Sequence, residues 1–289
     1  MDQRQPDPTR VASGPTMATS GLRGSAQFAY GRGTLKSELE GKVAVVTGAS
    51  GGIGEALVAA FVAEGASVIA GSRRGVDASD RVVSVTGDVR NPADMHALMA
   101  RGVERFGRVD VCVVNAGIWP EEVAPLHAMS EARVREVVET NLLGAMWTAR
   151  AFLFALAQTG PREDGHGASL IFIGSTAGRF GERGHAEYAT TKAALRGLML
   201  SLKNEIVLLD PHGRVNLVEP GWTVTPMAEA ALAEGGAMDR VTRTMALRQL
   251  AKPDDVAASV LFFASPTLAR HLTGQTLVVA GGMEGRTIW

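Results

Sequence analysis

The stretch Lys42-Val-Ala-Val-Val-Thr-Gly-Ala-Ser-Gly-Gly-Ile-Gly54 decides the fold, because an apolar, β-branched run leads directly into a glycine-rich turn. An amphipathic helix pattern then runs from Gly52 to Glu64. In such a turn, Gly48, Gly52 and Gly54 permit a tight bend and bring bare backbone close to a phosphate, whose charge the helix N-terminus favours. A flexible loop is the alternative for a glycine cluster, but the flanking strand and helix favour a dinucleotide-binding turn.

The rest of the chain repeats this alternation of short β-branched runs and longer helical patterns. We expect seven strands, at Lys42–Thr47, Ser67–Ser72, Val82–Thr86, Val109–Asn115, Ser169–Gly174, Arg214–Val218 and Thr276–Val279. We expect helices at Gly52–Glu64, Pro92–Phe106, Ser130–Ala157, Ala186–Leu209 and Pro253–Phe263. This order is typical of an α/β protein with a doubly wound Rossmann fold, a seven-stranded parallel sheet with helices on both faces, in a single domain.

The first 40 residues lack this pattern. Prolines stand at positions 6, 8 and 15, and no period of 2 or 3.6 is sustained. We therefore interpret residues 1–40 as a disordered or mobile N-terminal extension and residues 41–289 as one folded domain. The basic charges of the extension faintly resemble an organelle transit peptide, and the alternative is an over-long start with Met17 as the true initiator.

The composition narrows the class of protein. Hydrophobic residues make up 46% and charged residues 20% of the chain, which is ordinary for a globular protein. No apolar run reaches the roughly 18 residues of a membrane-spanning helix, so we expect no membrane partner. With 29 Lys and Arg against 30 Asp and Glu, the net charge of -1 disfavours a nucleic-acid partner. The single cysteine, Cys112, is interpreted as a buried, inert thiol, which fits a reducing compartment, and we expect a cytoplasmic protein.

A second stretch, from Ser175 to Lys192, contains the candidate chemistry. Tyr188 and Lys192 are four residues apart near the start of an expected helix, which places both side chains on one face. Ser175 follows the carboxyl end of an expected strand, the edge where open α/β sheets bind ligands. A phenol must lower its ordinary pKa near 10 by roughly three units, about 4 kcal/mol, to exchange protons near neutrality. A lysine ammonium roughly 4 to 5 Å away supplies an attraction of similar size, so we expect Lys192 to lower the pKa of Tyr188.

Together these motifs resemble those of the short-chain dehydrogenase/reductase family. The matching segments are Thr47–Gly54 (TGxxxGxG), Asn115–Gly117 (NAG), Pro220–Thr225 (PGxxxT), and Ser175 with Tyr188 and Lys192 (the serine and YxxxK site). The likeness covers Lys42 to Gly282, and the order and spacing of the motifs make it specific. The resemblance implies an NAD(P)(H)-dependent oxidoreductase that transfers a hydride between the nicotinamide and a secondary alcohol or ketone.

The resemblance also implies a role for each of four catalytic residues. Tyr188 is the acid and base, and Lys192 is its activator and the anchor of the nicotinamide ribose. Ser175 is the hydrogen-bond partner of the substrate oxygen, and Asn141 holds a proton-relay water. Asp88 is implied to bind the adenine amino group. The implied cofactor-binding residues are Gly48, Ser50, Gly52, Ile53, Gly54, Ser72, Arg73, Asp88, Val89, Asn115, Ala116, Gly117, Tyr188, Lys192, Pro220, Gly221, Thr223 and Thr225. No metal is expected, because the six histidines show no close ligand spacing.

The choice between the two nicotinamide cofactors depends on charge at the end of the second strand. An acidic residue there would repel a 2′-phosphate, whereas an arginine pairs with it. Ser72 is followed by Arg73 and Arg74, so we favour NADP(H), with Arg73 as the first contact. NAD(H) stays an alternative, because Gly51 stands where many NADP-preferring relatives have a basic residue. Only residues 75–81 separate the second and third strands, so we expect the family's usual helix there to be reduced to a loop.

Substrate choice should depend on the segments that follow the NAG motif, Ser175 and the PGxxxT segment. We name four candidate substrate residues, Trp119, Phe180, Trp222 and Met227. Their aromatic rings suggest an apolar or ring-bearing substrate, although packing at the edge of an oligomer explains them equally well. Residues from about 226 to 250 are interrupted by glycine and could close as a lid. We expect His185 to cap the helix that contains Tyr188.

Three further expectations concern alternatives and assembly. A 3-oxoacyl-carrier-protein reductase is the nearest alternative, but residues 202–205 lack the arginine with which that subgroup docks its carrier, so we favour a small-molecule ketone or secondary alcohol. A non-catalytic dinucleotide-binding sensor or scaffold is the alternative of a different class. The family resemblance implies a homo-tetramer or homo-dimer, built on the helices Ser130–Ala157 and Ala186–Leu209.

Overall fold

The computed structural model describes residues 36–233 and 235–287. Most of the extension expected at residues 1–40 therefore lies outside the described residues. Leu39 is fully buried against the sheet, and the compact unit begins at Lys36. The folded body thus includes residues 36–40, which composition alone assigns to the extension.

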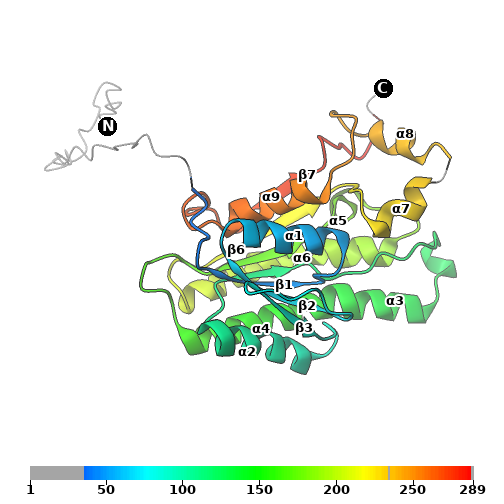
Figure 1. Ribbon diagram of the computed structural model, residues 1–289. Coiled ribbons are helices and arrows are strands. Elements are labelled where there is room, and N and C mark those ends of the chain that lie inside the picture. The colour runs from blue at the N-terminus through cyan, green and yellow to red at the C-terminus, as the bar shows by residue number, and fades with distance from the viewer. Residues whose placement is uncertain (1–35, 234, 288–289) are drawn as a thin grey trace, which may run out of the picture. The chain divides into compact units, whose positions relative to one another are not determined.

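A seven-stranded parallel sheet forms the centre of this unit (Figure 1). Its strands are β1 (Val43–Thr47), β2 (Ser67–Ser72), β3 (Val82–Thr86), β4 (Val111–Val114), β5 (Ser169–Ile173), β6 (Arg214–Pro220) and β7 (Thr276–Val279). Their order in the sheet is β3-β2-β1-β4-β5-β6-β7, and every neighbouring pair is parallel. The predicted doubly wound fold is confirmed.

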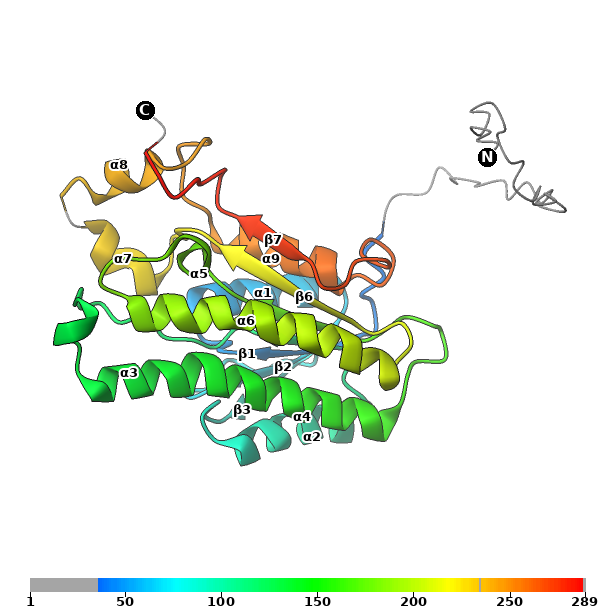
Figure 2. The same cartoon turned by 180° about the vertical axis from the view of Figure 1, so that it is seen from behind.

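Helices cover both faces of the sheet (Figures 1 and 2). On one face lie α1 (Gly52–Ala63) and α9 (Pro253–Ala264), and on the other α2 (Pro92–Phe106), α4 (Gly144–Thr159) and α6 (Ala186–Glu205). The strand β1 shows why its sequence is a continuous apolar run. Val43 and Val45 pack into the core beneath α2 and α4, whereas Ala44 and Val46 pack into the core beneath α1 and α9.

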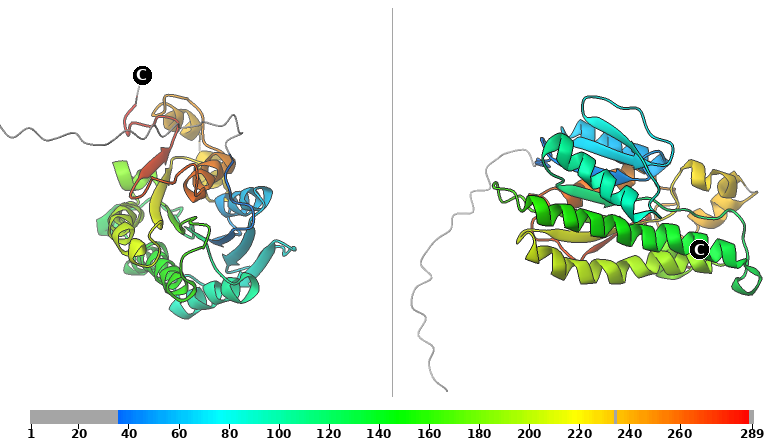
Figure 3. Two further views of the ribbon diagram at one scale, coloured as in Figure 1. Left: turned by 90° about the vertical axis from the view of Figure 1, so that its left-hand side faces the viewer. Right: turned by 90° about the horizontal axis from the view of Figure 1, so that it is seen from below.

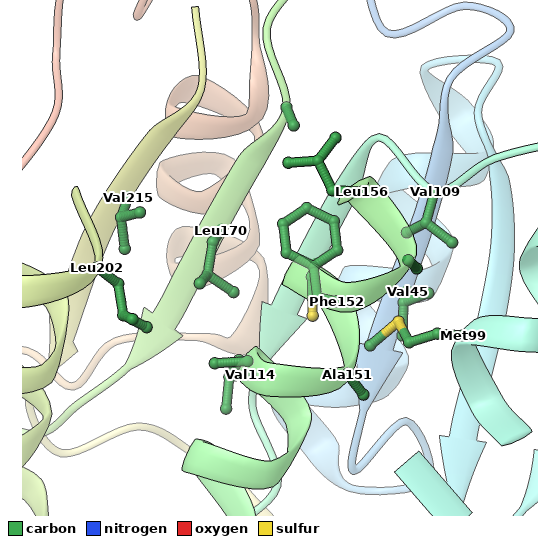
Figure 4. Close-up of a cluster of buried hydrophobic side chains, with 14 of the residues drawn as sticks. Val45, Met99, Val109, Val114, Ala151, Phe152, Leu156, Leu170, Leu202 and Val215 are labelled. Atoms are coloured by element: carbon green, nitrogen blue, oxygen red, sulfur yellow. The ribbon is translucent and has the colours of Figure 1, made fainter. Parts of the chain in front are cut away.

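The core beneath α4 contains large, fully buried side chains (Figure 4). Phe152 of α4 is drawn there together with Leu170 of β5 and Met99 of α2, and each of the three is 1% exposed or less. Burial of one such side chain stabilises the fold by roughly 1.5 to 3 kcal/mol. Cys112 of β4 belongs to the same core and is fully buried, as expected.

The helix expected at Ser130–Ala157 is not regular throughout. It consists of α3 (Glu131–Val138), a π-helical turn (Glu139–Leu143) and α4, which continue one another alongside α6 (Figure 3, right). Such turns widen the helix by one residue and are frequent at functional sites. This turn contains Asn141, one of the candidate catalytic residues.

Three short helices were not expected, namely α5 (Thr176–Phe180), α7 (Pro226–Ala233) and α8 (Ala237–Thr242). Short 3₁₀ segments also occur at Leu126–Ala128 and Ile206–Leu208. The connection between β2 and β3 contains no helix over residues 73–81, as expected from its length. The arrows of β6 and β7 point toward the end of the unit where α7 and α8 lie (Figure 2), so these helices stand at the carboxyl edge of the sheet. Among the described residues, no helix is long and apolar enough to cross a membrane.

Candidate active site

A cavity of about 730 Å³ opens at the carboxyl edge of the sheet. Its wall contains all the residues that the sequence assigns to the cofactor and the substrate, together with Ser175. Asn141 is the one candidate residue outside this wall. Segments far apart in the chain therefore line the same cavity, because the carboxyl ends of parallel strands lie at the same edge of the sheet.

The glycine turn is fitted tightly to the end of β4. Gly48 has a φ of +67°, and a Cβ atom there would lie 2.8 Å from the Cα of Ala116. A Cβ on Gly54 would overlap the carbonyl oxygen of Gly48. The Asn115 side chain donates to the carbonyl oxygens of Thr47 (2.9 Å) and Gly48 (3.2 Å), which fixes the turn to the neighbouring strand. The turn thus presents bare, rigid backbone to the cavity, as a phosphate site requires.

The wall at the end of β2 fits the adenosine part of a dinucleotide. The Ser72 hydroxyl is buried and has no hydrogen-bond partner among the described residues, although buried polar groups are normally paired. Arg73 and Arg74 follow it, are exposed, and line the cavity. Asp88 lies on the same wall, where its carboxylate accepts hydrogen bonds from the Arg90 guanidinium at 2.6 to 3.1 Å, and these bonds lower the pKa of Asp88. An unpaired hydroxyl and two arginines thus provide hydrogen-bond donors on this wall of the cavity.

The three groups of the serine and YxxxK site meet at the other end of the cavity. Ser175 stands at the start of α5, where its hydroxyl accepts from the Ala177 amide (3.1 Å), and its interaction with Tyr188 acts to lower the pKa of that phenol. The Lys192 Nζ donates to the Ile173 carbonyl oxygen (2.9 Å) and lies 5.7 Å from the centre of the Tyr188 ring. The one-turn spacing along α6 therefore places the lysine beside the tyrosine, as expected.

Burial dominates the ionisation of both groups. Burial raises the pKa of Tyr188 to about 12, and the Glu182 charge acts in the same direction while the Ser175 hydrogen bond opposes it. Burial also lowers the pKa of Lys192 to about 8. The sequence predicts a net lowering of the pKa of Tyr188 by Lys192, and this prediction is wrong, because burial gives a net rise. The cost of placing a charged phenolate in a buried site exceeds the attraction that a partly neutral lysine offers.

Asn141 lies behind the wall and supports it. Its Oδ1 accepts from the Ile118 amide (2.8 Å), and its Nδ2 donates to the Ile118 carbonyl oxygen (2.9 Å). A Cβ on Gly117 would lie 3.2 Å from both the Asn141 Oδ1 and the Lys192 Nζ. The π-helical turn thus positions an amide that holds the segment after the NAG motif against the lysine.

The substrate end of the cavity contains a cluster of aromatic and ionisable side chains. The Trp119 indole donates to Glu182 (3.2 Å), packs against the His185 ring with centroids 4.6 Å apart, and contacts the Trp222 ring edge-on at 6.1 Å. His185 makes no side-chain capping bond, contrary to our expectation, because its ring is packed against Trp119 instead. Burial raises the pKa of Glu182 to about 6, opposed by the bond from Trp119.

An ion pair that sequence reasoning missed fixes the first turn of α6. Arg133 of α3 donates from Nε (2.9 Å) and from a terminal nitrogen (2.7 Å) to one carboxylate oxygen of Glu187, the neighbour of Tyr188. It also donates to the Gly184 carbonyl oxygen (3.0 Å). Arg133 and Glu187 are 54 positions apart, so no local pattern in the sequence announces their contact.

Comparison with known proteins gives consistent matches over nearly the whole chain. A family model described as short chain dehydrogenase matches residues 42–235. The chain is 35% identical over 258 residues to a 3-oxoacyl-[acyl-carrier-protein] reductase of Vibrio cholerae, covering 85% of this chain and 98% of that protein. It is also 35% identical over 260 residues to an L-rhamnose 1-dehydrogenase (NAD(P)(+)) of Sphingomonas sp., covering 85% and 97%. The ligand-free structure of Thermoplasma acidophilum aldohexose dehydrogenase is similar with a TM-score of 0.77 at 29% identity, covering 88% of this chain and 98% of that chain.

Proposed function

Because this chain belongs to the short-chain dehydrogenase family of NAD(P)-dependent oxidoreductases, we propose that it interconverts a small-molecule secondary alcohol and the corresponding ketone. One observation carries the proposal. Ser175, Tyr188 and Lys192 converge at one end of the cavity whose other end is formed by the glycine turn and Ser72. A nicotinamide dinucleotide bound along this cavity supplies or accepts the hydride.

The residues of the chain handle the proton and the substrate oxygen. With a pKa of about 12, Tyr188 holds its proton at neutral pH and donates it to the oxygen of a carbonyl that is being reduced. The Ser175 hydroxyl, which lines the same cavity as Tyr188, steadies the negative charge that develops on that oxygen. Lys192, beside the Tyr188 ring, stabilises the phenolate that remains after proton transfer.

The charges at the end of β2 support NADP(H) as the preferred cofactor. Arg73 and Arg74 line the cavity there, and the adjacent Ser72 hydroxyl is unpaired. An arginine guanidinium binds a phosphate through two parallel hydrogen bonds, so a 2′-phosphate would complete this group. NAD(H) is the weaker alternative, because nothing acidic at that strand end would hold the ribose hydroxyls.

The test of the function is a spectrophotometric assay at 340 nm with NADPH and NADH against a panel of ketones, on the wild type and on Tyr188→Phe. We expect oxidation of NADPH by the wild type and a loss of at least a hundredfold in kcat for the variant, while its affinity for NADPH changes less than threefold. Oxidation of neither cofactor, in spite of binding, would support the non-catalytic sensor. Turnover by Tyr188→Phe at the wild-type rate would refute the assigned role of the phenol.

The carrier-protein reductase is kept as a second candidate, because one relative with 35% identity has that name. A β-ketoacyl thioester added to the same panel separates it from the small-molecule proposal. Activity at least tenfold higher with that thioester than with any free ketone would favour the carrier-bound substrate.

We also propose an assembly and a location for the enzyme. Met146 and Phe154 of α4 and Leu200 of α6 are large apolar side chains that are 40% exposed or more. Exposed apolar residues on these two long helices support a homo-dimer or homo-tetramer built on them. A single buried cysteine fits a reducing compartment and supports the proposed cytoplasmic location.

A further inference from the structure

A second cavity of about 420 Å³ adjoins the substrate end of the first. The two cavities share Trp119, Glu182, Trp222, Arg240 and Val241, so two indole rings, a carboxylate and a guanidinium belong to the wall between them. None of the residues assigned to the cofactor or to proton transfer lines this second space. It extends the room available to a substrate beyond the site of Tyr188.

The lining of the second cavity combines flat apolar surfaces with polar groups. It contains Trp119, Trp222, Glu121, Glu182, Arg183 and Arg240. Two acidic and two basic side chains balance one another, so the space has no net charge that would select a cation or an anion. Indole rings beside many hydrogen-bonding groups suit a neutral ring compound whose faces are apolar and whose rim is polar.

Glu182 is a half-buried group of this lining that leaves most of its hydrogen-bonding capacity unused. Its carboxylate accepts one hydrogen bond, from the Trp119 indole (3.2 Å), and has no ion-pair partner within the described part of the chain. A carboxylate accepts about four hydrogen bonds in total. Glu182 is close enough to Tyr188 for its charge to act on that phenol. Glu182 thus lines the same cavity as Tyr188 with most of its lone pairs unused.

We propose that the substrate is a polyhydroxylated ring compound, a sugar or a cyclic polyol, and that Glu182 selects it by accepting hydrogen bonds from hydroxyls near the reacting carbon. This inference rests on the proposed function. In the oxidative direction the substrate CH–OH loses a hydride to NAD(P)⁺ and its hydroxyl proton to the phenolate form of Tyr188. The products are the C=O compound, NAD(P)H and one proton, which leaves through Tyr188 to solvent.

Two other classes of substrate fit the same wall less well. A plain apolar ring would cover Glu182 without replacing the hydrogen bonds that its carboxylate makes to water, which costs binding free energy. A charged substrate would gain no net attraction, because two acidic and two basic side chains balance in this lining. A site built to hydrogen-bond a hydroxyl rejects an analogue that lacks it far more strongly than an apolar pocket rejects an extra group.

The first experiment compares ring compounds that differ in hydroxylation. Wild-type enzyme is assayed with NADP⁺ and NAD⁺ against cyclohexanol, 1,2-cyclohexanediol, myo-inositol and a set of aldohexoses and aldopentoses, and in reverse with cyclohexanone and phenanthrenequinone. We expect at least one polyhydroxylated ring to show a kcat/KM tenfold or more above that of cyclohexanol. A kcat/KM for cyclohexanol equal to or above all the hydroxylated rings overturns the inference while the proposed function stands. No turnover of any compound in either direction overturns both.

The second experiment assigns the selectivity to Glu182. In Glu182→Gln we expect kcat/KM for the preferred hydroxylated ring to fall at least tenfold, and that for cyclohexanol to change less than threefold. Glu163→Gln, an exposed glutamate outside both cavities, is the matched control and should leave both values unchanged. A parallel fall for both compounds in Glu182→Gln, or no change for either, overturns the role of Glu182.

A third variant guards against a folding defect in Glu182→Gln. Trp119→Phe keeps an aromatic ring but removes the N–H that holds Glu182. We expect KM for the hydroxylated ring to rise at least threefold more than KM for cyclohexanol, because only the hydroxylated ring depends on the position of Glu182. Equal changes in both KM values count against the inference, and thermal denaturation of each variant shows that it is folded.

Discussion

At the scale of single residues, burial acts in opposite directions on the two ionisable groups beside the substrate. Removal from water penalises charge, so the pKa of Tyr188 rises to about 12 while that of Lys192 falls to about 8. Each group is thereby held closer to its neutral form than in water. The tyrosine keeps a proton ready to donate, and the lysine changes charge near physiological pH.

The lysine should leave a signature in the pH dependence of stability. Its pKa is about 8 in the folded protein and 10.5 ordinarily, so the folded state binds fewer protons than the unfolded state between these values. The free energy of unfolding should therefore rise as the pH increases through this window, by about 2 kcal/mol between pH 8 and 9.5. Lys192→Met should abolish this rise, whereas Lys203→Met, on the same helix and outside the cavity, should retain it. Urea denaturation at four pH values makes the measurement, and an equal rise in wild type and Lys192→Met would contradict it.

The cofactor preference is also decided by single side chains. Arg73→Ala should weaken NADPH binding by roughly tenfold to a hundredfold, because a hydrogen bond to a charged group contributes about 1.5 to 3 kcal/mol. NADH binding should change less than threefold, since NADH lacks the 2′-phosphate. Fluorescence titration of both nucleotides gives the two dissociation constants. Arg101→Ala, on an exposed part of α2, is the control, and a similar loss for NADPH and NADH in Arg73→Ala would argue against a phosphate contact.

At the scale of elements, the sheet brings the segments of the site near one another, but specific side-chain contacts hold these segments in place. The π-helical turn Glu139–Leu143 presents Asn141 to both backbone groups of Ile118. The ion pair of Arg133 and Glu187 joins α3 to the first turn of α6, next to Tyr188. The hydrogen bonds of Asn141 and this ion pair both hold the wall of the cavity in a fixed position relative to Tyr188 and Lys192.

The sequence predicts the long helices and strands much better than it predicts these tertiary contacts. The seven strands begin and end within two residues of their expected bounds, because an apolar, β-branched run between turn residues is a direct sequence signal for a strand. The helices α5, α7 and α8 were missed, since each has eight residues or fewer and shows too little of a 3.6-residue period. Motif residues such as Ser175 and Tyr188 line the cavity, but the bond of Trp119 to Glu182 depends on tertiary packing and has no local signal.

The ion pair between α3 and α6 offers a test of this element contact. Glu187 is 4% exposed, so Arg133→Met should leave a buried carboxylate without its cation and lower the free energy of unfolding by about 3 to 5 kcal/mol. The double variant Arg133→Met with Glu187→Gln should recover most of this loss. Urea denaturation of the two single variants and the double variant measures the coupling.

Arg135→Met is the matched control on the same helix. The Arg135 side chain is 75% exposed, and its distance of 4.0 Å from Glu131 is long for an ion pair. Its removal should therefore lower the free energy of unfolding by less than about 1 kcal/mol. A double variant no more stable than Arg133→Met alone would show that the two side chains act independently.

At the scale of the whole molecule, the order of the strands explains why the cofactor and substrate residues share one cavity. Chain connections run outward in opposite directions from the neighbours β1 and β4, so a crevice forms where their following segments separate. The glycine turn follows β1 and the NAG motif follows β4, on either side of that crevice. Ser175 and the PGxxxT segment then continue the wall along β5 and β6.

A ligand that fills this crevice should stabilise the entire fold. Binding to the native state alone adds about 2.7 kcal/mol at a concentration of one hundred times the dissociation constant. For a protein of this size that corresponds to a rise in Tm of roughly 5 to 10 °C. Differential scanning fluorimetry should show this rise with NADPH, a smaller one with NADH at the same concentration, and little change with AMP. Identical curves with and without millimolar NADPH would exclude the crevice as a dinucleotide site.

The position of Cys112 gives this molecule a built-in reporter of its own opening. This thiol is the only one in the chain. It lies on β4, which pairs with β1 on one side and with β5 on the other, and it is fully buried. Burial also raises the pKa of the thiol. A disulfide reagent can therefore reach it only when β4 is exposed by separation of the sheet from its helices. The rate of labelling therefore reports how often the native protein opens toward the unfolded state. It needs no introduced probe and has no background from other thiols.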